Sequence, residues 1–342
     1  MRSSGFSMRV VLVCVLLCFS AWAALAQGPK RLVLAHAGEA NSMQAVAADE
    51  FAKRLQARLG GRVAVEVFGA GTLGNENFIV QKVRDGDIDL VIATAIMSSI
   101  SDEFGAFELP YLVLSREHVA KVRDELLRAY LGPAGRRAGL EVLALWDDGF
   151  RHVTMTRKPI VSPRDFDNIT LQVPQGEWRL RLFRSLGANA TPQDNAIKLS
   201  DARRLVELGV VDGREMSLSQ VQSTKFFEIQ PHLSLTRHVF APMYLISGAA
   251  KFAALPADVQ IAVKTVAREL QDWTARVSAA KERAILASLQ TKVKINSIDQ
   301  LDFLMVSLPI YQEFGRLVPQ GKSIVGLLYD PTSFLQIATT GR

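Results

Sequence analysis

The chain has 342 residues and a mass of 37.6 kDa, which is enough for two globular domains. Hydrophobic residues make up 49% and charged residues 22% of the sequence, so disorder over most of the length is excluded. The formal charge of +6 is spread over interspersed bases and acids, without the basic stripe of a nucleic-acid-binding protein.

The first 26 residues have the layout of a secretory signal peptide. Arg2 and Arg9 precede an apolar run over residues 10–22, and Ala24-Leu25-Ala26 is a small-x-small cleavage site. The run is shorter than the roughly 20 apolar residues that a membrane anchor needs. We therefore expect cleavage after Ala26 and a periplasmic location for the mature chain.

The mature chain would contain no cysteine, because Cys14 and Cys18 both lie in the signal segment. Disulfides, thiolate metal sites and cysteine nucleophiles are then excluded. Arg2 and Arg9 carry two of the six net positive charges, and their removal leaves +4. That charge provides no more than a mild attraction for anions.

Strands and helices alternate along the first half of the mature chain. Asn41 is the expected cap of a helix that ends at Leu59, before Gly60-Gly61. The alternation predicts an α/β lobe with a largely parallel sheet. The expected strands are 31–37, 62–68, 89–95 and 141–146, and the expected helices are 41–59, 75–84 and 117–130.

The pattern starts again after Gly149 and ends in one long helix. Apolar residues spaced 4-3-4-3-4 from Val259 to Val277 form a single stripe, and the pattern continues from Pro256 to about Leu289. Such a helix is roughly 50 Å long and is expected to brace two lobes. The other expected elements are strands 169–173, 234–240 and 243–247, and helices 177–186 and 201–208.

Several motifs suggest chemistry that their context does not support. The segment from Gly69 to Gly74 matches G-x-G-x-x-G, but a secreted protein has little access to NAD, and an earlier strand–helix unit precedes this strand. We interpret it as a glycine-rich turn. The five histidines form no H-E-x-x-H motif, and no G-x-S-x-G is present. The sequence therefore predicts no metal, no cofactor and no enzymatic activity.

An ordered set of short segments resembles the periplasmic solute receptors of tripartite ATP-independent periplasmic (TRAP) transporters, of the dicarboxylate-receptor type. One of them is Gly149-Phe150-Arg151-His152, and another is Leu73-Gly74-Asn75-Glu76. The segments follow the family's order and cover most of the chain between residues 31 and 290. They are 60–68, 73–76, 87–90, 107–111, 149–152, 158–160, 210–213, 225–230 and 236–239.

The resemblance implies a two-lobed α/β fold with a central cleft and a long helix that spans both lobes. Lobe I would comprise residues 27–149 and 242–281, and lobe II residues 150–241 and 282–342. The implied function is that of an extracytoplasmic receptor that binds a small organic acid in the cleft and delivers it to the integral-membrane subunits of a TRAP permease.

The resemblance also implies a ligand site with one unusual feature. Arg151 would hold a carboxylate, but the family's second arginine, in an Arg-Val-Pro segment, is replaced here by Gln172. Met216 stands where the family has an amide. The expected ligand-binding residues are Arg151, Gln172, Gln175, Trp178, Glu215, Met216, Thr94, Glu76 and His36.

The loss of one guanidinium predicts a change of ligand. A hydrogen bond to a charged group contributes about 1.5–3 kcal/mol, against about 1 kcal/mol for a neutral one. Gln172 in place of arginine would therefore weaken carboxylate binding on the order of tenfold. Gln172 and Met216 together favour a ligand that is less acidic and more apolar than a four-carbon dicarboxylate, unless Arg214 restores the missing charge.

Two other classes of function stay open at this point. The protein could be a ligand sensor that closes and docks on a membrane signalling protein, since the same cleft would serve that role. A periplasmic enzyme is poorly supported because the sequence contains no catalytic motif.

Overall fold

The computed structural model describes residues 30–192 and 199–340, whose strands form one ten-stranded sheet. The strands are β1 (Lys30–His36), β2 (Val63–Phe68), β3 (Leu90–Ala93), β4 (Leu140–Met155), β5 (Thr170–Val173), β6 (Asn189–Pro192), β7 (Gly213–Ser217), β8 (His232–Leu235), β9 (Phe240–Gly248) and β10 (Lys294–Ser297). The sheet follows the path β2-β1-β3-β9-β4-β7-β5-β6, and β8 and β10 branch from β4. The signal segment predicted at 1–26 lies outside the described residues.

Helices cover the sheet on both sides. The α-helices are α2 (Met43–Arg58), α3 (Glu76–Asp85), α4 (Met97–Ile100), α5 (Arg116–Leu126), α6 (Gly132–Arg137), α7 (Glu177–Ser185), α8 (Leu199–Glu207), α9 (Leu218–Thr224), α10 (Ala249–Ala253), α11 (Ala257–Leu289), α12 (Gln300–Leu317), α13 (Gly321–Leu328) and α14 (Pro331–Thr340). Short 3₁₀ and π turns are η1 (Asp102–Glu108), η2 (Leu127–Leu131), η3 (Pro163–Phe166) and η4 (Phe226–Glu228). Within the described residues, no helix has the length and apolarity needed to cross a bilayer.

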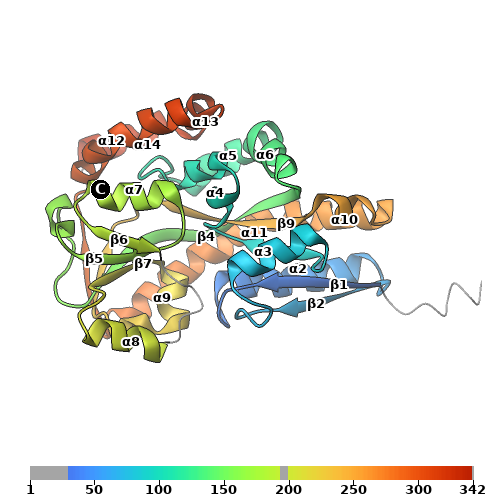
Figure 1. The fold of residues 1–342 in the computed structure, drawn as a ribbon, viewed down its shortest axis with the longest axis horizontal. Helices are drawn as coiled ribbons and strands as arrows, with labels where there is room; N and C mark the ends of the chain where they lie inside the picture. The colour runs from blue at the N-terminus through green and yellow to red at the C-terminus, as the bar shows by residue number, and fades with distance from the viewer. Residues whose placement is uncertain (1–29, 193–198, 341–342) are drawn as a thin grey trace, which may run out of the picture.

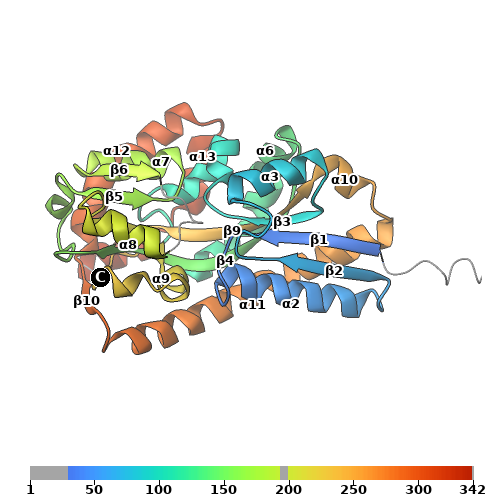
Figure 2. The same cartoon turned by 60° about the horizontal axis from the view of Figure 1, so that its bottom comes forward.

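The molecule has two lobes, as expected. Figures 1 and 2 show β1, β2, β3, α2 and α3 on one side and β5, β6, β7, α7, α8 and α9 on the other. The predicted long helix is confirmed as α11, which has 33 residues and runs along both lobes in Figure 2. Val263 and Leu270 pack with Phe51 of α2, whereas Ile285 and Leu289 pack in the cluster around α9. The assignment of residue ranges to the two lobes stays a prediction.

Strand β4 passes from one lobe into the other. Residues up to Phe150 pair with β9, and the residues from Arg151 onward pair with β7. The prediction that this strand ends at Trp146 is wrong. Gly149, with φ of 97°, lies in a register shift between Asp147 and Phe150, and the strand continues because β7 takes up its backbone groups beyond the shift.

Three local predictions are also wrong. Ser42, not Asn41, caps α2 by accepting the Ala45 N–H at 3.3 Å, because Asn41 adopts a positive φ of 64°. The expected strand 234–240 breaks at Arg237, whose φ of 46° no strand accommodates. The sheet of the first lobe is parallel only at β1–β2 and β1–β3, since β9 runs antiparallel to both β3 and β4.

The C-terminal helices had no counterpart in the sequence analysis. Helix α12 packs against α7, and α13 packs against α5 and η1, so this segment contacts both sides of the molecule. Figure 1 shows α12, α13 and α14 grouped at one edge. Tyr311 of α12 donates its hydroxyl hydrogen bond to the carbonyl of Pro110.

A buried cluster of ion pairs connects helix α11 to the register shift in β4. Arg116 donates from Nε to Asp147 at 2.7 Å and from Nη2 to Glu282 of α11 at 2.8 Å. The other oxygen of Glu282 accepts the Phe150 N–H at 2.9 Å. A Cβ on Gly149 would lie 2.2 Å from the Glu282 carboxylate, so only glycine fits beside it. The cluster fixes the point at which the strand changes lobes.

We expect Glu282→Gln to lower the free energy of unfolding by about 1–3 kcal/mol, because the amide removes one of the two charged partners of Arg116 in a buried setting and leaves only Asp147. Urea unfolding measures this change. The matched control is Glu269→Gln on the same helix, whose side chain is 41% exposed and pairs with Arg58. Its cost should be below about 1 kcal/mol, and equal costs for both variants would contradict the role given to the cluster.

Candidate functional site

Two adjoining hollows lie where the lobes meet. The first, the arginine cavity, encloses about 430 Å³ of space that is partly open to solvent. Its walls come from α4, η1, β4, α7, α9 and β9 and from the segments that follow β3 and β5. The lining residues are Thr94, Ala95, Ser98, Phe104, Phe107, Glu108, Asp148, Arg151, Pro174, Arg179, Gln220, Ala241, Pro242 and Tyr244.

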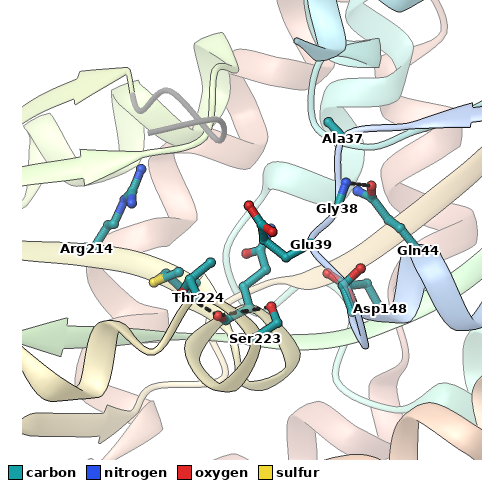
Figure 3. Close-up of a pocket in the computed structure, with 11 residues that line it drawn as sticks. Ala37, Gly38, Glu39, Gln44, Asp148, Arg214, Ser223 and Thr224 are labelled. Atoms are coloured by element: carbon teal, nitrogen blue, oxygen red, sulfur yellow. Dashed lines mark hydrogen bonds between the residues drawn. The ribbon is translucent and has the colours of Figure 1, made fainter. Parts of the chain in front are cut away.

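The second hollow, the hydroxyl cavity, encloses about 560 Å³ and is also partly open. Figure 3 shows Ala37, Gly38 and Gln44 on one side and Arg214, Ser223 and Thr224 on the other. The two cavities share Asp148 and Gln220 in their linings, so they adjoin each other, and we refer to the pair as the passage. The lining residues are Ala37, Gly38, Glu39, Ser42, Gln44, Asp148, Arg214, Met216, Gln220, Ser223 and Thr224.

Glu215 is the centre of the charge network behind the arginine cavity. Arg151 donates from Nε to the Glu215 carboxylate at 2.5 Å and from Nη2 to the Glu215 carbonyl at 2.9 Å. His238 lies 3.0 Å from the same carboxylate and Arg179 lies 3.5 Å from it. Burial opposes ionisation of Glu215, but the nearby Arg151 and Arg179 guanidinium groups outweigh it and lower the pKa of this carboxyl group.

Arg179 of α7 offers unused donors to the cavity. Its side chain is 3% exposed, and Nε has no hydrogen-bond partner in the described part of the chain, whereas Nη1 faces Glu215 Oε2 at 3.5 Å without a hydrogen bond. The hydroxyl of Tyr244, also buried, has none either. Burial raises the pKa of Tyr244 well above its usual value, so this phenol stays a neutral donor. Buried donors without partners on a cavity wall indicate a site built to receive an acceptor.

Arg179 adds a second guanidinium to the wall of the arginine cavity, although it is not among the residues predicted from the sequence. The residue lies seven positions after Gln172, on a helix instead of a strand, and no motif marks it. Arg179 stands in α7 between Trp178 and Leu180, and all three side chains are buried. A buried arginine needs a partner, and sequence alone does not show where that partner lies.

Three of the predicted site residues line the passage. Arg151 and Thr94 line the arginine cavity, and Met216 lines the hydroxyl cavity. Glu76 supports Thr94, because its carboxylate accepts from the Thr94 backbone N–H and, at 3.1 Å, from the Thr94 hydroxyl. Glu215 supports Arg151, as described above.

The other predicted residues lie near the passage in structural roles. Trp178 is buried against Phe314 of α12, with ring centroids 4.9 Å apart. Gln175 is exposed and accepts a hydrogen bond from Asn77 at 3.0 Å. Gln172 is partly buried within β5, between β6 and β7.

The glycine-rich segment packs closely against His36, which accounts for its glycines without a bound nucleotide. A Cβ on Gly69 would lie 2.7 Å from the buried His36 ring, so this position requires glycine for close packing. Gly74 has a φ of 117°, which side chains rarely adopt. The glycines therefore shape a turn against β1. Among the described residues, no three histidine, cysteine or acidic side chains group as they would around a metal ion.

Asp148 is the acid shared by both cavities. Burial, partly offset by attraction to Arg151, raises its pKa from 3.8 to about 7. Because the folded-state value lies above the unfolded one, the folded protein binds the extra proton between these two pH values. Asp148 thus contributes stability below its unfolded pKa that is lost as the pH rises through about 7.

We therefore expect the melting temperature of Asp148→Asn, relative to wild type, to be higher at about pH 8 than at about pH 5, because the amide never ionises. Calorimetry at both pH values measures the difference. Asp102→Asn, an exposed substitution at the start of η1, is the control and should show no such trend. A pH-independent difference for Asp148→Asn would refute the raised pKa.

Comparison with known proteins places these features in a family. The model of the family described as bacterial extracellular solute-binding protein, family 7, matches residues 34–316. The 2,3-diketo-L-gulonate-binding periplasmic protein YiaO of Escherichia coli is 28% identical over 287 residues, which cover 82% of this chain and 86% of that protein. A solute-binding protein of Verminephrobacter eiseniae is 30% identical over 285 residues, which cover 81% and 82%.

A solved structure shows the same fold with a ligand. The sugar acid binding protein of Advenella mimigardefordensis, in complex with galactonate, superposes with a TM-score of 0.81 at 26% identity. The match covers 92% of this chain and 99% of that one. The two-lobed architecture and the long helix are therefore shared with proteins that capture solutes outside the cytoplasm.

Proposed function

This chain belongs to family 7 of the bacterial extracellular solute-binding proteins, the receptors of TRAP transporters, and we propose that it captures a hydroxylated monocarboxylic acid between its lobes and delivers it to a TRAP-type membrane permease. It is an extracytoplasmic receptor for small organic acids and not an enzyme. We propose the identity of the acid, the residues that hold it and the permease partner.

The observation that carries the proposal is the set of unused donors in the arginine cavity. Arg179 presents Nε and Tyr244 presents its hydroxyl, both buried and without hydrogen-bond partners among the described residues, while Arg179 Nη1 lies 3.5 Å from Glu215 Oε2. Arg151, already bonded to Glu215, adds positive charge to the same wall. A carboxylate is the ligand group that accepts from a guanidinium in a two-bond geometry, and such charge-assisted bonds are the strong ones.

The hydroxyl cavity suits the remainder of a hydroxylated acid. Ser42, Gln44, Gln220, Ser223 and Thr224 provide neutral donors and acceptors along its walls. Met216 lies among these polar residues, so the lining combines hydroxyl and amide groups with apolar surface. Arg179 also offsets the charge that Gln172 removes. The galactonate complex of the Advenella mimigardefordensis protein supports a sugar acid as the class of ligand.

Contacts between the lobes suggest how ligand binding is signalled to the permease. Ser219 of α9 accepts the Met43 N–H of α2 at 3.0 Å, and Asn77 of α3 donates to Gln175 at 3.0 Å. A ligand that touches both lobes would favour the conformation in which these contacts form. The permease would then recognise the closed form, which only the loaded receptor populates to a large extent.

We expect Arg179→Gln to weaken binding of galactonate by about 10- to 100-fold, the loss of one or two charge-assisted hydrogen bonds. Isothermal titration measures it. The matched control is Arg184→Gln, an exposed arginine on the same helix, which should bind as the wild type does. The proposal fails if a panel of hydroxylated monocarboxylates leaves the melting temperature of the wild type unchanged, or if loss of the Arg179 charge leaves affinity intact.

The location rests on the signal segment, and we propose that it is cleaved after Ala26. Expression of the full chain in a Gram-negative host should yield a periplasmic protein whose mass corresponds to a start at Gln27. Ala26→Lys should leave the uncut precursor with the membrane fraction, because the cleavage site requires a small residue. An intact N-terminus on the wild-type periplasmic protein would contradict this assignment.

A further inference from the structure

Glu108 extends from η1 to the first turn of α7. Its Oε2 accepts the backbone N–H of Arg179 at 3.2 Å, and its Oε1 accepts the Ser98 hydroxyl at 2.6 Å. Helix α7 has Gly176 at its N-cap, without a side-chain cap of its own. The Glu108 carboxylate therefore occupies the position that an anion takes at a helix N-terminus.

The fold holds this carboxylate firmly on the cavity wall. A Cβ on Gly176 would lie 2.0 Å from Glu108 Oε1, so the glycine is what allows the close approach. Glu108 is 2% exposed and lines the arginine cavity together with Arg179. Any ligand in that cavity meets a guanidinium and a fixed carboxylate side by side.

The charged groups around the cavity are two guanidinium groups and three buried carboxyl groups. Arg151 and Arg179 supply two positive charges, and the buried carboxyl groups of Glu215 and Glu108 face them. Burial raises the pKa of Glu108 and attraction to Arg179 opposes that rise. Asp148 adds a third buried carboxyl group at the junction of the cavities. A first ligand carboxylate finds the unused N–H donors of Arg179, whereas a second would lie among acids.

We infer that Glu108 is a specificity-determining residue that admits monocarboxylates to this site and rejects dicarboxylates of the same length. The inference rests on the proposed function and names its substrate class more narrowly. Like charges brought together in a buried site repel strongly, because little water screens them. With its own carboxylate, Glu108 occupies the position at the start of α7 that a second ligand carboxylate would take.

The test compares two six-carbon acids, D-galactonate with one carboxylate and galactarate with two, by isothermal titration. We expect the wild type to bind galactonate at least about tenfold more tightly than galactarate. Glu108→Gln keeps the size of the side chain and an amide oxygen that accepts the Arg179 N–H, but removes the charge. It should lower the ratio of the two affinities by about tenfold or more, mainly through tighter binding of galactarate.

The matched control is Glu103→Gln, in the same η1 segment. Glu103 is 5% exposed and pairs with Arg137 away from the cavity, so its substitution should leave the ratio unchanged. A wild type that prefers galactarate overturns the inference without any variant. If galactonate binds and the ratio is the same in Glu108→Gln and wild type, only this inference fails. If neither acid nor any other hydroxylated monocarboxylate binds the wild type, the proposed function fails with it.

Discussion

The buried carboxylate of Glu215 is the charge around which this site is arranged. It is fully buried and is approached by Arg151 of β4, Arg179 of α7 and His238 of the segment before β9. An unpaired charge in such a place would cost several kcal/mol, so these elements must meet for either charge to be tolerated. Arg151 is held by its bonds to Glu215, and Arg179 is left with donors that no other described residue uses.

The same arrangement explains why the site lies where β4 changes lobes. Arg151 follows directly after Phe150, whose N–H is held by Glu282 of the long helix. A rigid crossing point places the guanidinium at the boundary of the lobes, within reach of a ligand that contacts both. The adjacent Asp148 then faces both cavities, so one stretch of strand supplies the crossing point between the lobes, a guanidinium on the cavity wall and a titratable acid.

Much of the fold was predictable because local patterns carry it. The stripe from Val259 to Val277 determined a helix longer than one lobe, and the ordered segments indicated the receptor family. The ends of the strands and the helix caps were harder to predict from the sequence. Trp146 and Asn41 were wrong boundaries, since the continuation of β4 depends on its pairing with β7 and the cap of α2 depends on the φ angle of Asn41.

By itself, the sequence determined the class of protein: a solute receptor with two α/β lobes and an arginine, Arg151, in a family motif. Those properties follow from composition, periodicity and short motifs, which are local. Only the tertiary structure decided that Arg179 lines the same cavity as Arg151, that Gln172 lies within a strand and that Glu108 reaches the start of α7. These are contacts between residues far apart in the chain, and the free energy that selects them comes from burial of charge, which no local pattern encodes.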